Sequence, residues 1–277
     1  MSEPRLLLLV PAYNEERRIE PVLRDYARFF AERYRGTFQL VVVLNGCTDD
    51  TLGVVRRVAA ECPAVRALEF KAPIGKGGAL LEGLKLAPTC DLIGYVDADG
   101  ATSPQAFLDL VQHIGEADCV IGSRWLPGAV LHRSQTGDRQ FASRVFHALV
   151  QLLFRLGIRD TQCGAKVMTR EVAERIRPAL RIADMAFDID LLVATRQAGY
   201  RILEVPTEWT DQAGSKVALF RSSLTMLLSV VRIRLVHSPF HGWLRPLRPL
   251  EDWLYDRLRA PRPWPGRDPE ERGSRAG

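Results

Sequence analysis

Two aspartates separated by a single alanine stand where an apolar segment of the chain ends. Residues 92–96 have the pattern of a buried strand, and Asp97 and Asp99 follow it directly. Because residues two apart on an extended chain point to the same side, both carboxylates can face one ion. Hard divalent cations such as Mg²⁺ or Mn²⁺ take oxygen ligands and often bridge to substrate phosphates. A metal site is one interpretation of this pair, and a solvated turn is the other.

Three further polar segments follow runs that are predicted to be strands in the first half of the chain, at residues 11–15 (PAYNE), 45–51 (NGCTDDT) and 75–79 (GKGGA). If the preceding runs form a parallel sheet, their carboxyl ends lie along one edge, where open α/β sheets bind ligands. The four segments can then build one site. This convergence favours the metal interpretation of Asp97 and Asp99.

The glycine-rich segment carries one lysine, Lys76, at the start of a predicted helix. Helix amides, a flexible backbone and an ammonium group together suit a phosphate, although a solvated lysine in a glycine turn is the simpler interpretation. The segment lacks the G-x-x-x-x-G-K-[ST] spacing of a Walker A loop. No G-x-G-x-x-G follows the first apolar run and no G-x-S-x-G occurs, which argues against a dehydrogenase or a hydrolase.

The spacing of apolar residues predicts the elements that position these segments. The first half is expected to contain strands at 6–10, 38–44, 65–70, 92–96 and 119–121, and helices at 15–35, 48–62, 76–87 and 103–115. Ser103 and Pro104 form a typical helix start, and Thr48 is expected to cap the second helix. Strands that alternate with helices predict an α/β fold with a mostly parallel sheet covered on both faces.

The second half of the chain has a different pattern. Its expected elements are loops at 123–137 and 160–166, helices at 138–156, 170–180, 188–198 and 219–236, and a strand at 202–209. The helix at 219–236 has a thin polar stripe on a mostly apolar surface. This pattern suits a helix lying in a membrane interface, and it equally suits a helix packed on the core or in a dimer contact.

The net charge of +5 comes entirely from the last fifth of the chain. Residues 1–220 hold 27 basic and 27 acidic residues, whereas residues 221–277 hold 11 arginines and 6 acidic residues. Such an excess suggests an anionic partner such as a lipid surface, and a solubilising arginine-rich tail is the alternative. The neutral body argues against a nucleic-acid-binding protein.

Composition places the chain among cytosolic globular proteins. Its five cysteines are scattered, which fits reduced thiols better than a disulfide framework or a zinc site. We expect no secretory signal and no membrane-spanning helix, because no apolar stretch reaches about 20 residues. The chain is divided into a domain at 1–218, a basic amphipathic segment at 219–260, and a tail at 261–277 whose Pro, Gly and charge content predicts disorder.

Nine short motifs occur in an order that resembles one enzyme family: PAYNE, NGCTDDT, GKGGALLEG, DADGAT, GSR (122–124), DTQCGAK (160–166), FDIDLL (187–192), EVPTEW (204–209) and GSKV (214–217). Over residues 5–236 this set resembles the family 2 glycosyltransferases, which have the GT-A fold. Within that family it is similar to the dolichyl- and polyprenyl-phosphate sugar synthases. DADGAT and DTQCGAK resemble the glucosyl branch more than the mannosyl branch.

The resemblance implies roles for the residues at matching positions. The catalytic residues would be Asp97, Asp99, Arg124 and Asp190, of which Asp99 and Asp97 would bind the metal. The donor would be bound by Pro11, Tyr13, Glu15, Asn45, Lys76, Asp97, Arg139, Gln162 and Lys216. Of the basic residues, Arg124, Arg139 and Lys216 would face the phosphates of donor and acceptor. Gln162 and Cys163 would lie beside the transferred sugar. Asp188 and Asp190 would lie near the acceptor, although two acids at a helix N-terminus are also favoured by the helix dipole alone.

The reaction implied by the resemblance is an inverting transfer of a hexose, glucose from UDP-glucose, to a polyprenyl or dolichyl phosphate with Mg²⁺ or Mn²⁺. It would take place at the inner face of the membrane, to which the protein would bind peripherally. The oligomeric state, including a homo-oligomer, stays open. Asn45 stands where the family commonly has an acid, so the choice between UDP and GDP as the nucleotide of the donor also stays open. Transfer of mannose from GDP-mannose, a soluble acceptor, and nucleotidyl transfer are the alternatives.

Overall fold

The computed structural model describes residues 4–132, 137–182, 184–210 and 219–237 of the chain. The first strand, β1 (Leu6–Ala12), lies at the centre of the sheet. Its side chains alternate between two hydrophobic cores, with Leu8 and Val10 in one and Leu7 and Leu9 in the other. Both faces of the strand are therefore buried, which explains why its sequence is apolar throughout.

Within the described residues, seven strands form one sheet in the order β3-β2-β1-β4-β7-β5-β8. Besides β1 these are β2 (Phe38–Asn45), β3 (Val65–Phe70), β4 (Leu92–Tyr95), β5 (Cys119–Ser123), β7 (Lys166–Thr169) and β8 (Ile202–Pro206). All neighbours pair in parallel except β7, which is antiparallel to β4 and β5. Strands β2 and β3 extend from one side of β1 and β4 from the other, and open α/β sheets bind ligands at such a reversal. The expected mostly parallel sheet is confirmed.

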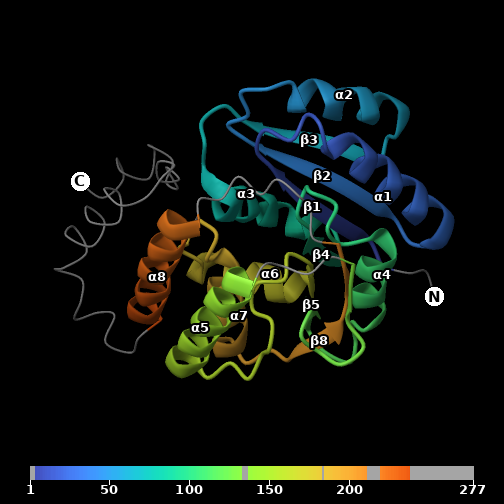
Figure 1. The fold of residues 1–277 in the computed structure, drawn as a ribbon. Helices are drawn as coiled ribbons and strands as arrows, with labels where there is room; N and C mark the ends of the chain where they lie inside the picture. Colours follow the sequence, from blue (N-terminus) through green and yellow to red (C-terminus); the bar gives the residue numbers. More distant parts are fainter. Residues whose placement is uncertain (1–3, 133–136, 183, 211–218, 238–277) are drawn as a thin grey trace, which may run out of the picture.

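Helices cover both faces of the sheet (Figure 1). One face is covered by α1 (Ile19–Arg33), α2 (Thr51–Glu61) and α4 (Pro104–Gln112). The other is covered by α3 (Gly75–Gly83), α5 (Gly137–Phe154), α6 (Arg170–Ile176), α7 (Phe187–Gln197) and α8 (Leu219–Val236). Short 3₁₀ turns at Leu84–Thr89 and Arg177–Ala179 prolong α3 and α6. The predicted helices at 76–87 and 170–180 therefore end in tighter turns.

Strand β7 was not expected from the sequence, which predicted a loop up to residue 166 and then a helix. Its four residues pair with β4 on one side and β5 on the other, so that Lys166 lies opposite Tyr95. A strand of four residues carries too little periodicity to be recognised locally. A second unexpected feature is the two-residue parallel pair of β6 (Val130–Leu131) and β9 (Glu208–Trp209).

Two helix starts test the expected caps. Ser103 caps α4 as expected, because its hydroxyl oxygen accepts a hydrogen bond from the Ala106 amide at 3.2 Å, and Pro104 is the first helical residue. The expectation for Thr48 was wrong. The second helix begins at Thr51 with Asp50 in the capping position, and the Thr48 side chain bonds to Asn14 instead.

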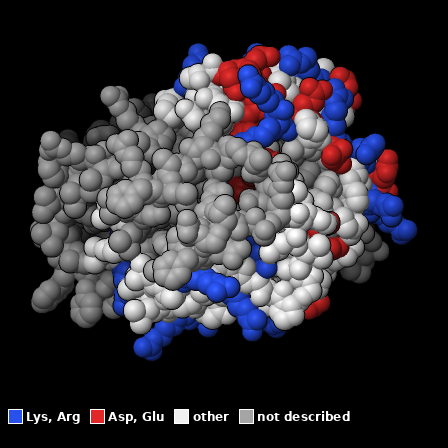
Figure 2. Space-filling model, in the orientation of Figure 1, with Lys and Arg blue, Asp and Glu red and all other residues white. Residues whose placement is uncertain are grey.

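Helix α8 packs on the body of the protein through one of its sides. Val230 and Ile233 are fully buried in the second core, whereas Val231 is 45% exposed. None of the helices in the described part of the chain is long and apolar enough to cross a membrane. On the face shown in Figure 2, acidic and basic side chains mix around the α1 and α2 end, and the lower edge carries mainly basic side chains. Residues 238–277, with most of the predicted basic segment and the tail, lie outside the described residues.

Candidate active site

The loops that follow β1 and β2 are tied together by hydrogen bonds. The Asn14 side-chain amide donates to Thr48 Oγ1 at 3.1 Å, and the Thr48 backbone amide donates to Asn14 Oδ1 at 2.8 Å. The Glu15 amide donates to Thr51 Oγ1 at 2.9 Å. Asn14 has a φ of 55°, in the left-handed region that asparagine tolerates better than most residues. Two of the four polar segments thus form one structural unit.

Asn45, at the end of β2, positions the third segment. Its Oδ1 accepts hydrogen bonds from the amides of Ile74 at 2.5 Å and Gly75 at 2.9 Å, which begin the glycine-rich turn of α3. Gly46 has a φ of 62°, and a Cβ atom there would lie 2.5 Å from the Pro73 nitrogen. Only glycine fits this close approach. The described contacts of Asn45 are therefore with the chain's own backbone.

Asp97 and Asp99 follow β4 at the same edge. Asp97 Oδ2 lies against Gly164, where an added Cβ atom would be only 2.1 Å away. Asp99 Oδ1 accepts a hydrogen bond from the Ala101 amide at 3.0 Å. Burial, together with the neighbouring Asp97 charge, raises the pKa of the Asp99 carboxyl. The two carboxylates are therefore close enough to repel each other, and a bound cation would relieve that repulsion.

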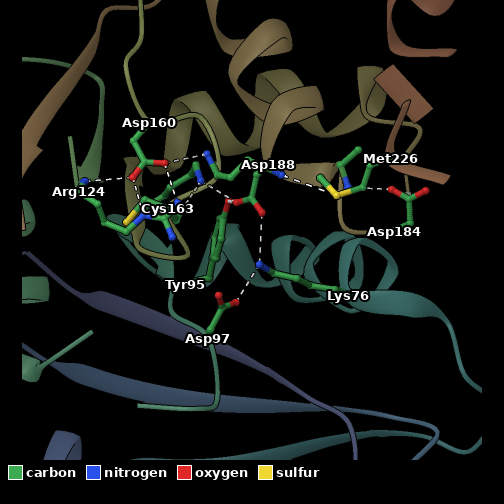
Figure 3. Close-up of polar contacts among 12 residues, drawn as sticks. Lys76, Tyr95, Asp97, Arg124, Asp160, Cys163, Asp184, Asp188 and Met226 are labelled. Atoms are coloured by element: carbon green, nitrogen blue, oxygen red, sulfur yellow. Dashed lines mark hydrogen bonds and ion pairs between the residues drawn. The ribbon is translucent and has the colours of Figure 1, made fainter. Parts of the chain in front are cut away.

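Lys76 reaches across the site from the start of α3 to two carboxylates (Figure 3). Its Nζ lies 2.8 Å from Asp97 Oδ1 and 3.2 Å from Asp188 Oδ2. Burial alone would lower the pKa of the Lys76 ammonium, but Asp188 and Asp97 raise it above its ordinary value. Lys76 is thus a permanently charged group that is 14% exposed and joins the acid pair to α7.

Asp188 is the centre of a buried charge cluster. Besides Lys76, its carboxylate contacts Lys166 Nζ at 2.6 Å and accepts a hydrogen bond from the Tyr95 hydroxyl at 2.5 Å. Burial alone would raise the pKa of the Asp188 carboxyl, yet the two lysines and Tyr95 lower it well below its usual range. Lys166 is fully buried and also donates to the Cys163 carbonyl at 2.6 Å. Asp188 therefore stays ionised.

Arg124, just beyond β5, forms a second buried ion pair. Its Nε and Nη2 donate to the two oxygens of Asp160 at 2.7 and 2.9 Å, and its guanidinium lies 4.9 Å from the centre of the Trp209 ring. The Asp160 amide and the Arg159 amide both donate to Glu204 on β8. This pair ties the DTQCGAK segment to the sheet and holds the guanidinium in one orientation.

The other predicted site residues are placed as follows. Tyr13 is 51% exposed, Pro11 is partly buried, and Glu15 forms a two-bond pair with Arg18 at 2.7 Å. Gln162 Nε2 lies 4.0 Å from the Met226 sulfur of α8 (Figure 3). The structure thus brings Lys76, Asp97 and Asp188 into direct contact and ties the Asn14 and Asn45 loops together.

Asp190 has different partners. Its Oδ2 accepts hydrogen bonds from the amides of Arg181 and Ile182, and its Oδ1 lies 2.7 Å from His237 Nε2 beyond the end of α8. These described contacts tie α7 to neighbouring segments, and a catalytic role for Asp190 stays a prediction. Arg139 is in α5, but its side chain lies outside the described structure, as does the whole of Lys216.

Four contributors to the site were given no role from the sequence: Tyr95, Asp160, Lys166 and Trp209. Asp160 and Lys166 begin and end the DTQCGAK motif, and Trp209 ends EVPTEW, so the motifs themselves were the available signal. Tyr95 lies inside an apolar run and looks like a core residue. Its partner Lys166 is brought opposite to it only by the β4–β7 pairing.

A divalent cation fits the acid pair if it shares its other ligands with a substrate. Within the described ranges, no group of three or more His, Cys, Asp or Glu side chains is arranged to hold a metal. Mg²⁺ typically binds through one or two carboxylates and completes its shell with water and phosphate oxygens. Asp97 and Asp99 match this type of site, and they would hold the ion together with a bound diphosphate.

Comparisons with known proteins find one matching family model and several relatives of this chain. The family model described as glycosyl transferase family 2 matches residues 8–177. The dolichyl-phosphate beta-glucosyltransferase of Dictyostelium discoideum is 35% identical over 244 residues, which cover 83% of this chain and 73% of the relative. The human protein of the same name is 33% identical over 249 residues, covering 83% and 75%.

A further relative and a solved structure extend the comparison. Glycosyltransferase AglD of Haloferax volcanii is 34% identical over 228 residues, and this chain spans only 36% of that longer protein. Glucosyl-3-phosphoglycerate synthase from Mycobacterium tuberculosis, solved with Mn²⁺, UDP and glucosyl-3-phosphoglycerate, superposes with a TM-score of 0.63 at 18% identity. The match covers 85% of this chain and 82% of that one. The structural match establishes a shared fold.

Proposed function

This chain belongs to glycosyltransferase family 2, and from that premise we propose that it transfers glucose from UDP-glucose to a polyprenyl or dolichyl phosphate. The observation that carries the proposal is the match over most of the chain to relatives named dolichyl-phosphate beta-glucosyltransferase, at 33 to 35% identity. The acid pair, Lys76 and Arg124 at one edge of the sheet supply the groups that such a reaction needs.

In this proposal the loops after β1, β2 and β4 bind the donor. Tyr13 is exposed and available to stack on a base, and Asn45 fixes the turn that presents Lys76. Lys76 and Arg124 are held by buried carboxylates, so their positive charges are oriented before the substrate arrives. Oriented charges lower the barrier because they need no reorganisation during the reaction. Gln162 lies on the same segment as Asp160, and in this proposal it would contact the transferred sugar.

The chemistry of the acceptor makes a strong general base unnecessary. A lipid monophosphate has a second pKa near 6, so it is mostly dianionic at neutral pH and its oxygen can attack C1 directly. Burial raises the pKa of the Cys163 thiol to about 12, so this group stays protonated beside the sugar and is no base. A divalent cation bound by Asp97 and Asp99 would offset the charge that develops on the leaving nucleotide. Direct attack inverts the anomeric centre.

The acceptor also sets where the protein acts. We propose that it binds the inner face of the membrane peripherally, through the basic segment at 219–260. Each basic residue near an anionic leaflet contributes about 1 kcal/mol. Helix α8 is the first part of this segment and reaches the site, because the Met226 sulfur lies 4.0 Å from Gln162 Nε2. The proposed division is thus a catalytic domain at 1–218 followed by a membrane-binding segment at 219–260. The first part of that segment, α8, packs on the catalytic domain.

The test is an incubation with radiolabelled UDP-glucose or GDP-mannose, polyprenyl phosphate, and Mg²⁺ or Mn²⁺. The expected product is an organic-soluble glucosyl lipid formed from UDP-glucose, absent from Asp99→Ala and present with Lys85→Met, a surface variant. Mannosyl lipid formed from GDP-mannose alone would assign the mannosyl branch instead. Transfer to 3-phosphoglycerate without lipid would assign a soluble acceptor, and pyrophosphate release from a sugar phosphate and UTP would assign nucleotidyl transfer.

A further inference from the structure

The two oxygens of Asp97 have different surroundings. Oδ2 lies against Gly164, at 2.1 Å from the position of an ideal Cβ atom, and Oδ1 lies 2.8 Å from Lys76 Nζ. Asp97 is 30% exposed, whereas Lys76 is 14% exposed. The carboxylate oxygen that lies farther from Gly164, Oδ1 at 3.2 Å from the same Cβ position, is therefore already paired with a cation belonging to the chain.

Lys76 does not depend on Asp97 alone for its position. It also lies 3.2 Å from Asp188 Oδ2, while the other oxygen of Asp188 is contacted by Lys166 and by the Tyr95 hydroxyl. If Lys76 left Asp97, it would keep a buried carboxylate as partner. The fixed pair of Asp188 and Lys166 therefore allows Lys76 to change its contacts at the exposed end without becoming an uncompensated buried charge.

We propose that Lys76 occupies the metal-binding oxygen of Asp97 in the nucleotide-free enzyme and exchanges this place with the divalent cation when the donor binds. The inference rests on the proposed function, because it takes the acid pair as the cation site. Lys76 then contacts the donor diphosphate, and Asp188 retains it near the site. In this way the chain excludes a tightly bound metal until a diphosphate is present to share it.

The physical basis is competition between two positive charges for one oxygen. A lysine ammonium and a divalent cation within a few Å repel each other strongly in a partly buried site, even at a high effective dielectric constant. Neutralising residue 76 removes this repulsion and frees Asp97 Oδ1. The variant is therefore expected to bind metal more tightly in the absence of nucleotide, although it has lost a phosphate-binding group. A lysine that bound phosphate without contacting the acid pair would leave the affinity for the metal alone unchanged.

The experiment measures Mn²⁺ binding by electron paramagnetic resonance, with no nucleotide, for the unaltered chain and for Lys76→Met. We expect the Mn²⁺ dissociation constant of Lys76→Met to be lower by about tenfold or more. The matched control is Lys85→Met, which also removes one positive charge, because Lys85 is 51% exposed and pairs only with Glu82 among the described residues. Its Mn²⁺ affinity is expected to stay within about twofold. In a separate titration with UDP, the UDP dissociation constant of Lys76→Met is expected to be about tenfold higher than that of the unaltered chain.

Unchanged or weaker Mn²⁺ binding by Lys76→Met would overturn the inference, as would the absence of measurable binding to both proteins. Lys76→Arg keeps the charge and is expected to bind Mn²⁺ like the unaltered chain, so tightening in that variant would also overturn it. Asp188 retains Lys166 and Tyr95 in Lys76→Met, which favours folding, and Lys76→Gln is measured in parallel so that either folded variant decides. The Mn²⁺ titration uses neither a sugar donor nor an acceptor. A failure of sugar transfer would therefore count against the proposed function, and the comparison of Mn²⁺ affinities would still test this inference.

Discussion

Replacement of Gly164 by alanine perturbs the position of Asp97 without changing any charge. Gly164 lies in the loop before β7, and it is not among the glycines with a positive φ, so alanine is compatible with the backbone. The new methyl group would lie 2.1 Å from Asp97 Oδ2 and 2.6 Å from its Cγ. The Asp97 side chain is 30% exposed and can retreat towards solvent, which makes a local shift the expected response.

The size of the effect follows from the distance that the carboxylate must move. Ordinary van der Waals contact begins at 3.4 Å, so relief of the clash requires a displacement of about 1 Å. A misplacement of about 1 Å at a reacting centre lowers the rate by about 10²-fold. This loss corresponds to about 2.7 kcal/mol in transition-state free energy. Because Asp97 Oδ1 also contacts Lys76, the affinity for Mn²⁺ is expected to change as well.

The assay compares kcat/KM for glucosyl lipid formation by Gly164→Ala and by Gly83→Ala. The second variant creates a similar clash, 2.6 Å from Leu9 Cδ1, but in the core between α3 and β1. It is therefore expected to lower the midpoint of urea unfolding and to leave kcat/KM of the folded enzyme almost unchanged. If Gly164→Ala retained kcat/KM within about threefold of the unaltered chain, the placement of Asp97 against Gly164 would not matter for catalysis.

Three further predictions concern the buried charges. Asp188→Asn is expected to lower the free energy of unfolding by about 3 to 5 kcal/mol, because it leaves Lys166 buried without a counter-ion. Its control is Asp91→Asn, which breaks an exposed pair with Arg5 and is expected to cost at most about 1 kcal/mol in the same urea titration. The pKa of Asp188 is lowered in the folded state, so the stability that it provides is present above its unfolded pKa of about 4 and is lost as the pH falls below that value. Urea midpoints measured from pH 7 to pH 3 should therefore decline below about pH 4, and less steeply in Asp188→Asn; an unchanged slope would contradict the assignment. Arg124→Lys keeps the charge but cannot form two parallel bonds to Asp160, and we expect kcat/KM for polyprenyl phosphate to fall by about tenfold, whereas equal kinetics would show that the planar group is dispensable.

The first half of the fold could be predicted because its information is local. Four of the first five strands are short apolar runs that alternate with helices, and β3, which also contains Arg66 and Glu69, has the bounds that the sequence indicates. Strand β7 escaped prediction because it forms from four residues that are buried only when β4 and β5 lie on either side. The helix start at Thr48 was misjudged for a related reason. Its hydroxyl could satisfy a helix amide or bond to Asn14, and only the approach of the β1 loop decides between them.

The part of the site that lies in the loops directly after the predicted strands could be predicted from the sequence. Asp97, Asn45 and Lys76 were all expected at one edge, and the structure joins Lys76 to Asp97 directly. The partners of Lys76 in the second half were not predictable, because Asp188 is 112 residues away and sits at a helix start where a surface acid is ordinary. The local sequence does not distinguish an exposed acid at a helix start from a buried acid, such as Asp188, that is paired with a fully buried lysine.

The arrangement of charges explains why so many ionised groups can share one poorly hydrated region. Asp188 and Lys166 neutralise each other in the buried layer, where an unpaired charge would be costly. Above them, Lys76 offsets one charge of the acid pair Asp97 and Asp99, which leaves a single formal negative charge in the absence of ligands. A divalent cation alone would reverse that charge and face Lys76 across Asp97. A cation that arrives with a diphosphate would bring negative charges with it, so under the proposed exchange the site would bind the two together in preference to the metal alone.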